Sequence, residues 1–415
     1  AKLLFTLGIM ALFRLGSILP APGVNLANVK TCIGQTQDQG LLSLVNVFSG
    51  GALLQLSVFA LGIMPYITAS IIIQLLRVVI PRFEELHKEG QAGTAKLTEY
   101  TRYLTIGLGL LQSSTIVATA SSGRLFPGCT AEIIPGGSVI TMLLMIITMT
   151  AGTGLIMWLG ELITERGIGN GMSLLIFTSI VAQFPSNMFS IAGGNGGTAK
   201  FLIVVGVVLV ATLAVVYIEQ AQRRIPVQYA KRMIGRRQYG GSTTYIPVKI
   251  NTAGVIPVIF ASSILAMPQL IAGFGNQRSK WVQWIMTHLQ QTHPVYLTAY
   301  GFLILFFAFF YTAITFDAEE IADNMKRYGG FIPGIRAGEP TVRYLSYVIN
   351  RITTAGSIYL VVLALIPTLA VIGLELSQHL PFGGTTILIM VGVGLQTVKE
   401  VNSQLQQRHY EGFLS

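Results

Sequence analysis

Ten apolar runs follow one another along this chain of 415 residues. A helix that spans a bilayer needs about 20 apolar residues, and a single soluble core stops growing beyond roughly 250–300 residues. Only 11% of the residues are charged, whereas soluble domains average about 25%. The pattern predicts an all-α membrane protein with ten transmembrane helices. The expected spans are 3–19, 53–76, 103–120, 139–159, 172–184, 201–218, 253–271, 296–315, 354–372 and 386–398.

Lysine and arginine are distributed unevenly between the loops that join these spans. If the N-terminus is inside the cell, twenty of them fall in the cytoplasmic loops and tail, and five fall in the loops on the opposite side. This bias follows the positive-inside rule, so both termini are expected to be cytoplasmic. The rule does not explain why the cytoplasmic loop at residues 219–250 is so long. We interpret this loop, together with residues 317–352, as a docking surface for a partner. Because Ala1 already lies in an apolar run, we expect further residues ahead of it.

The spans divide into two sets of five, in residues 1–191 and 192–415. Because five is odd, the second half would enter the membrane inverted, and such repeats place a working site between the halves. Pro65 and Pro257 occupy matching positions in spans two and seven, where a mid-helix proline would break the helix beside a cavity. We therefore expect two inverted five-helix halves around a central pore. Residues 43–51, too short to span, fit a re-entrant helix or a surface loop equally well.

The sequence contains no recognisable nucleotide-binding, metal-binding or catalytic motif, so neither an enzyme nor a cofactor is expected. Ion-coupled transporters usually carry ionisable groups at the midplane, whereas the acidic residues here lie near helix ends. A passive pore is therefore favoured over the alternatives, a secondary transporter of a small solute and a structural scaffold. Arg14, inside the first span, is expected to snorkel toward headgroups rather than to meet a partner in the bundle. For Cys32 and Cys129, two free thiols are favoured over a disulfide.

Several motifs are shared with a known family. They include Phe-Ala-Leu-Gly-Ile-Met-Pro-Tyr-Ile at residues 59–67 and Ile-Thr-Glu-Arg-Gly-Ile-Gly-Asn-Gly at residues 163–171. Others lie at residues 48–52, 74–76, 158–161, 222–225, 251–263, 310–312, 322–324, 331–336 and 383–385. Because they recur in order over essentially the whole chain, the sequence resembles the SecY family, the channel subunits of bacterial protein-export translocases.

That resemblance implies a function and a set of partners. The chain would be a protein-conducting channel of the bacterial plasma membrane, passing unfolded secretory proteins across the bilayer and releasing membrane proteins sideways into it. Its expected partners are the SecE and SecG subunits, the SecA motor ATPase, the ribosome, signal sequences and nascent polypeptides. The expected docking residues for the ribosome or SecA are Arg224, Arg236, Arg237 and Arg336, since the planar guanidinium pairs with phosphate or carboxylate.

The resemblance also implies roles for residues in the pore. The expected pore ring is Ile63, Ile67, Ile176, Ile259, Ile264 and Ile389. The expected plug lies near residues 41–52 and includes Asn46, Phe48, Ser49, Gly50 and Gly51. A lateral gate would open between spans two and three on one side and spans seven and eight on the other. Gln74 and Asn251 are its candidate polar residues.

Overall fold

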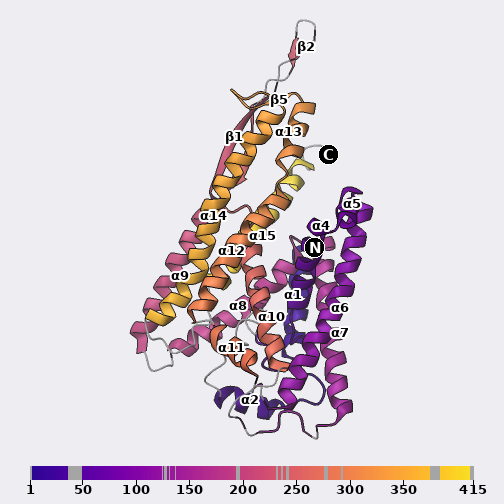
Figure 1. Ribbon diagram of the computed structural model, residues 1–415, viewed down its shortest axis with the longest axis vertical. Helices are drawn as coiled ribbons and strands as arrows, with labels where there is room; N and C mark the ends of the chain where they lie inside the picture. The colour runs from indigo at the N-terminus through magenta and orange to yellow at the C-terminus, as the bar shows by residue number, and fades with distance from the viewer. Residues whose placement is uncertain are drawn as a thin grey trace.

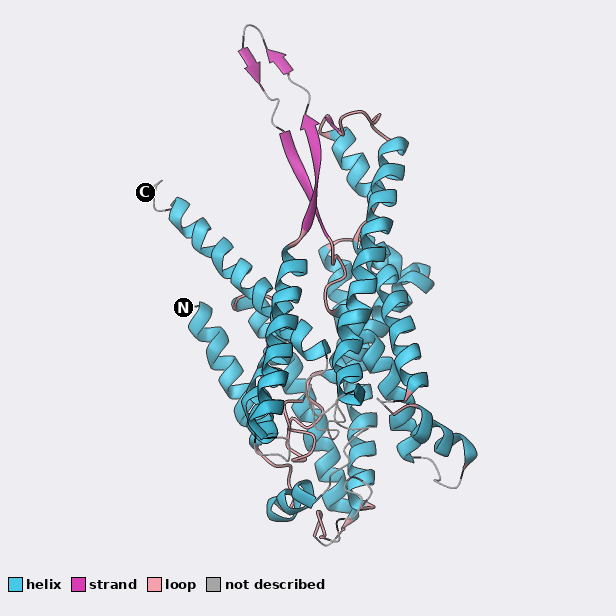
Figure 2. Ribbon diagram, turned by 90° about the vertical axis from the view of Figure 1, so that its left-hand side faces the viewer, coloured by secondary structure: helices cyan, strands magenta, loops and turns pink. Residues whose placement is uncertain are grey.

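The computed structural model shows a mainly helical protein whose long helices run side by side (Figure 1). It describes residues 2–35, 49–123, 125, 129, 131–135, 137–192, 197–229, 232–234, 237–239, 243–274, 279–290, 293–373 and 384–411. Viewed from the side, β-strands project from one end of the helical bundle (Figure 2). Two short helices, α2 (Leu26–Gln35) and α11 (Lys280–His288), lie toward the other end (Figure 1).

The remaining elements confirm the helical class that the sequence predicts. The first half contains α1 (Lys2–Ile18), α4 (Met64–Val79), α5 (Pro81–Lys88), α6 (Gln91–Ser121), α7 (Val139–Arg166) and α8 (Gly171–Ala192). The helices of the second half are α9 (Gly197–Gln220), α10 (Ile256–Phe274), α12 (Pro294–Thr315), α13 (Ala318–Arg327), α14 (Glu339–Gly373) and α15 (Gly384–Glu411). The strands are β1 (Gln222–Tyr229), β2 (Arg232–Ile234), β3 (Arg237–Tyr239), β4 (Thr243–Lys249) and β5 (Gly330–Phe331).

Many of these helices have the length and composition of membrane spans. Within the described residues, four segments are long and apolar enough alone: Gln91–Ser121, Val139–Arg166, Pro294–Arg327 and Glu339–Ile366. The pair α4 and α5, bent by 101°, would make a fifth. Shorter apolar helices occur at Gly171–Pro185, Val205–Gln220 and Ile256–Pro268. Large apolar side chains also cover their outer faces, as at Leu213 on α9, which is 69% exposed. The described helices are therefore consistent with the ten expected spans, but they do not identify each of the ten separately.

The start of the second expected span is not helical. Residues 49–63 form a series of turns, and the helix begins only at Met64. The side chains of Leu53 and Leu56 are fully buried in an apolar core shared with α2 and with the ends of α6 and α7. The apolar character of this stretch therefore reflects burial in protein rather than contact with lipid. We call this region, comprising α2, residues 49–61 and the described residues between 125 and 134, the cap.

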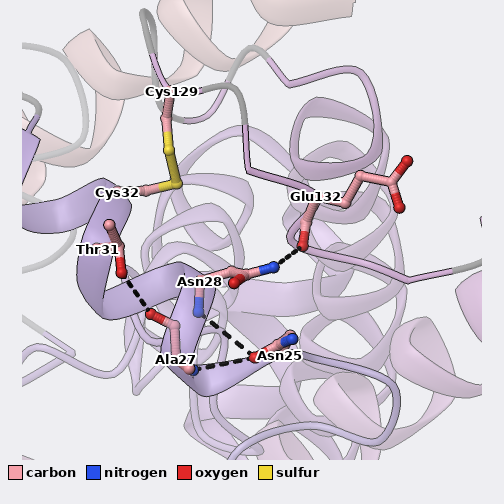
Figure 3. Close-up of a disulfide and its surroundings, with 7 residues drawn as sticks. All are labelled: Asn25, Ala27, Asn28, Thr31, Cys32, Cys129 and Glu132. Atoms are coloured by element: carbon pink, nitrogen blue, oxygen red, sulfur yellow. Dashed lines mark hydrogen bonds between the residues drawn. A yellow bond between two sulfur atoms is a disulfide. The ribbon is translucent and has the colours of Figure 1, made fainter.

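A disulfide between Cys32 and Cys129 holds the cap together (Figure 3). It joins α2 to the segment that follows α6, across a sequence separation of 97. Beside it, Nδ2 of Asn28 donates to the carbonyl oxygen of Glu132 at 2.7 Å. The expectation of two free thiols is wrong, because folding of residues 49–123 brings two sites distant in the sequence into contact.

The long loop between α9 and α10 contains a β-hairpin rather than irregular chain. Strands β1 and β4 pair antiparallel, from Gln222 opposite Lys249 to Gln228 opposite Thr243. The short strand β5, which follows α13, pairs with the other edge of β1, so the sheet order is β4-β1-β5. Side chains of this sheet pack on α14 through a separate small core. The two long loops expected from the sequence therefore form one folded unit.

One glycine fixes how closely α7 approaches the cap. A Cβ atom on Gly152 would overlap the carbonyl oxygen of Val58, so Gly152→Ala should push α7 away from the turns and cost about 1–3 kcal/mol. Gly107→Ala on α6 is the matched control, because no atom lies within 4 Å of its Cβ position. The control should stabilise its helix by up to about 1 kcal/mol. The thermal midpoint of the purified protein should fall only for the first variant; equal midpoints would contradict the close approach.

Candidate functional site

A cluster of isoleucines is buried where helices from both halves of the chain meet. Ile63, Ile67, Ile176, Ile259 and Ile389 belong to one apolar core. They come from the residue before α4, from α4 itself, and from α8, α10 and α15. All but the half-buried Ile67 are at most 9% exposed. We call these five residues the isoleucine cluster, and it contains five of the six residues expected in the pore ring.

The sixth residue, Ile264, lies outside this core and is 36% exposed. It follows Ile259 by five residues on α10, which turns it by about 140° around the helix axis, since each residue advances the helix by about 100°. Conversely, the same core contains Ile180, which is 3% exposed and was not expected from the sequence. Ile180 lies one turn beyond Ile176 on α8, so a four-residue spacing of isoleucines was the signal that could have identified it.

Two similar turns start the helices that carry part of the cluster. Gly62 and Gly254 have φ angles of 55° and 62°, a conformation that glycine adopts without strain. Each lies two residues ahead of a helix, α4 or α10, and Pro65 and Pro257 are the second residues of those helices. The expectation of prolines in mid-helix is therefore wrong. Proline lacks an N–H, so it is tolerated in the first turn, where that group needs no partner within the helix.

The contact between α4 and α10 closes one side of the cluster. Ile71 of α4, Phe260 of α10 and Phe307 of α12 are each at most 4% exposed and pack together. The rings of Phe260 and Phe307 meet edge to face, with centroids 5.6 Å apart. These three apolar residues were not expected from the sequence, which points to polar positions at this interface.

The two polar residues expected at this interface make hydrogen bonds within the protein. Nε2 of Gln74 donates to Oγ of Ser70, one turn earlier on α4, at 3.3 Å. Asn251 is 4% exposed, and its Nδ2 donates to Oε1 of Glu219 at 2.5 Å and to the carbonyl oxygen of Gly254 at 3.2 Å. Asn251 therefore fixes the turn that leads into α10.

The described part of the expected plug lies against α1 and α8. Asn46 and Phe48 fall outside the described residues. The fully buried Ser49 accepts a hydrogen bond at Oγ from the backbone N–H of Leu53 at 3.1 Å. Nη1 of Arg14 donates to the carbonyl oxygen of Gly50 at 2.7 Å. The expectation that Arg14 snorkels toward headgroups is therefore wrong, because its guanidinium has an acceptor within the bundle.

Two of the basic residues expected at the docking surface, Arg224 and Arg336, lie near the projecting sheet. Arg224 is exposed on β1, and Arg336 is exposed in the segment after β5. Arg237 lies in β3, where the structure does not describe its side chain, and Arg236 falls outside the described residues. Arg224 and Arg336 thus belong to the unit that β1, β4 and β5 form.

The physical character of the site is apolar, since its five isoleucines pack in one buried hydrophobic core. Among the described residues, no three His, Cys, Asp or Glu side chains lie where they could share a metal ion. Branched apolar side chains that converge at one level can exclude water and ions by dewetting. Because those side chains come from separate helices, a shift of the helices would widen the constriction without breaking a covalent bond.

Comparison with known proteins identifies the family to which this chain belongs. The SecY family model matches residues 57–398. The chain is 62% identical to the protein translocase subunit SecY of Streptomyces scabiei over 420 residues, covering 100% of this chain and 96% of that protein. It is 56% identical to the subunit of the same name from Mycobacterium tuberculosis over 427 residues, again with 100% and 96% covered.

Solved structures show the same fold at lower identity. A structure described as that of a protein-conducting channel matches with a TM-score of 0.65 and 21% identity, covering 97% of this chain and 91% of that one. The channel of a canine ribosome–channel complex from the endoplasmic reticulum matches with a TM-score of 0.62 and 19% identity, with the same coverage. With the family match over most of its length, this chain belongs to the SecY family.

Proposed function

We infer that this chain is the channel subunit of a protein translocase, through which unfolded polypeptides cross the membrane or enter it. The observation that carries this conclusion is the isoleucine cluster, a buried apolar cluster to which both halves of the chain contribute. Relatives over 55% identical along the whole chain are named protein translocase subunit SecY. The chain is therefore a channel subunit and not an enzyme, and the alternative of a small-solute transporter is not favoured.

The isoleucine cluster, with Ile180, is the pore ring in this proposal. Compliant, branched side chains around a narrow waist would seal the resting channel and fit closely around a passing polypeptide. Ile264, more exposed and on another face of α10, would contribute only after the helices move. A signal sequence would open the channel by binding the open state more tightly than the closed one, which shifts the population toward the open state.

The lateral gate in this proposal is the interface of α4 and α10. Apolar packing of Ile71, Phe260 and Phe307 supports it, because such contacts separate without leaving unpaired charges. The resemblance to the family assigns Gln74 and Asn251 to opposite sides of this interface, and both remain gate residues in this proposal. The plug would include residues 49–51, which lie against α1 and α8 beside the cluster.

The same proposal covers topology and location. The two halves, residues 1–191 and 192–415, would be inverted repeats, which the matching turns at Gly62 and Gly254 support. Figure 1 places α5, the β-strands and α13 toward one end and α2 and α11 toward the other. Basic loops gather at the first end, so the positive-inside rule supports cytoplasmic termini. We place this multi-pass protein in a bacterial plasma membrane.

Translocon partners dock on the folded cytoplasmic unit in this proposal. Structural relatives include channels bound to ribosomes, which supports a ribosome as one partner. SecA would dock at the same surface. Arg224, Arg236, Arg237 and Arg336 would pair with phosphate or carboxylate groups. SecE and SecG would pack on the lipid-facing helices.

Crosslinking tests the function directly. With a photoreactive amino acid at Ile67 or Ile259, a stalled secretory chain should crosslink to the channel, since the chain must pass the isoleucine cluster. The matched control carries the probe at Leu213, 69% exposed on the outer face of α9, and should give only background. Equal yields at all three positions, or none at the first two, would contradict the proposed path.

A further inference from the structure

Arg14 places a positive charge inside the helical bundle. It lies on α1, is partly buried, and donates from Nη1 to the carbonyl oxygen of Gly50 at 2.7 Å. Its neighbour Phe13 is 1% exposed, so α1 is packed against protein at this level. A guanidinium in such surroundings is costly unless it is paired or hydrogen-bonded. The Gly50 carbonyl therefore satisfies a group that would otherwise destabilise the bundle.

The segment that supplies this carbonyl fits tightly against α8. The φ angles of Gly50 and Gly51 are 70° and 86°. A Cβ on Gly50 would lie 3.2 Å from the Cα of Ser179, and one on Gly51 would lie 2.5 Å from Nε2 of Gln183. The absence of side chains at Gly50 and Gly51 thus lets this part of the backbone lie between α1 and α8, with the Gly50 carbonyl directed at Arg14.

The turns that follow are held to α1 and to the residues just after it by different contacts. The backbone N–H of Val58 donates to the carbonyl of Leu19 at 2.9 Å, and that of Ala21 donates to the carbonyl of Leu56 at 2.9 Å. The rings of Phe13 and Phe59 stack with centroids 5.8 Å apart. Loss of the Arg14 side chain would leave these contacts intact, so its effect should be confined to residues 49–51.

We propose that Arg14 is a positioning residue that holds residues 49–51 against α8 and so stabilises the closed arrangement of the channel. The proposal rests on the proposed function only in calling that arrangement closed. A hydrogen bond from a charged donor is roughly twice as strong as a neutral one, and arginine offers a fork of donors where lysine offers a point charge.

Thiol labelling tests this role without any transport assay. Ser49→Cys places a thiol at a fully buried site on the segment, and the native cysteines are paired and do not react. In membrane vesicles, adding Arg14→Gln should raise the rate of labelling by a membrane-impermeant maleimide about tenfold, since a hydrogen bond to a charged group is lost. Arg14→Lys should give an intermediate rate, and it also serves if the glutamine variant fails to accumulate.

Ser57→Cys is the matched control, because Ser57 is also fully buried but lies in the turns held by α1. Its labelling rate should not change with Arg14→Gln. An unchanged rate at Ser49→Cys, or equal acceleration at both positions, would overturn the proposal, the second result indicating general loosening. Selective labelling in a chain that fails the crosslinking test would retain the role of Arg14 and remove the channel assignment.

Discussion

Replacing Ile63, Ile67 and Ile176 together by glycine is expected to make the resting channel leak ions. The three side chains belong to the isoleucine cluster and come from the residue before α4, from α4 and from α8, so their removal opens a wettable gap in it. Because an apolar constriction excludes ions by dewetting, ion flux through vesicles containing the variant should rise about tenfold or more. Planar-bilayer conductance or the collapse of a potassium gradient would measure it, with no secretory substrate present.

The matched control replaces three lipid-facing isoleucines by glycine. Ile147, Ile203 and Ile358 are 52% to 62% exposed on α7, α9 and α14. Glycine costs each helix about 1 kcal/mol, so the control carries a similar conformational cost without opening the cluster. It should not leak. A leak of equal size in both triple variants would show that unstable helices cause it. No leak in either variant would show that the isoleucine cluster does not seal the channel.

Loss of the disulfide should have the second large effect. The double variant Cys32→Ser with Cys129→Ser removes a crosslink that closes a loop of 97 residues. For a loop near 100 residues, the chain-entropy model gives about 4.7 kcal/mol, and native disulfides typically contribute about 2–4 kcal/mol. We expect the smaller figure here, because hydrogen bonds such as that from Asn28 to Glu132 still hold α2. The thermal midpoint of the purified protein should fall by several degrees.

A reductant provides the internal control for this experiment. Dithiothreitol should lower the midpoint of the unmodified protein toward that of the double variant and leave the double variant unchanged. If the reductant lowers the midpoint of both proteins equally, its effect does not come from reduction of this disulfide. If neither the reductant nor the substitutions move the midpoint, the cap is stable without the crosslink.

The sequence predicted the helical class from local signals, and it predicted most of the isoleucine cluster through the resemblance to the SecY family. Apolar runs near 20 residues long are typical of membrane spans, and the motif at residues 59–67 that the chain shares with the family contains Ile63 and Ile67. The paired Gly and Pro near residues 65 and 257 also marked the correct places. Both prolines are expected in mid-helix but lie at the start of a helix, because a sequence shows that a helix is interrupted but not on which side of the proline it resumes.

The errors involve contacts between residues far apart in the chain. Composition alone cannot tell whether Leu53 and Leu56 contact lipid or a protein core, and the structure places them in the cap. For Cys32 and Cys129, the sequence left a disulfide as the less favoured alternative, because it does not show which distant segments the fold brings into contact. Arg14 was assigned to the headgroups because its acceptor, the Gly50 carbonyl, is a backbone atom without a sequence signature.

The sequence separation of 97 between Cys32 and Cys129 also has a consequence for synthesis. Chains grow at about 5–20 residues per second, so the earlier cysteine waits roughly 5–20 s before the later one has even been made. During that delay it is an unprotected thiol, open to oxidation or to a wrong partner. The order of synthesis therefore makes the bond a late step, completed only after α4, α5 and α6 have left the ribosome.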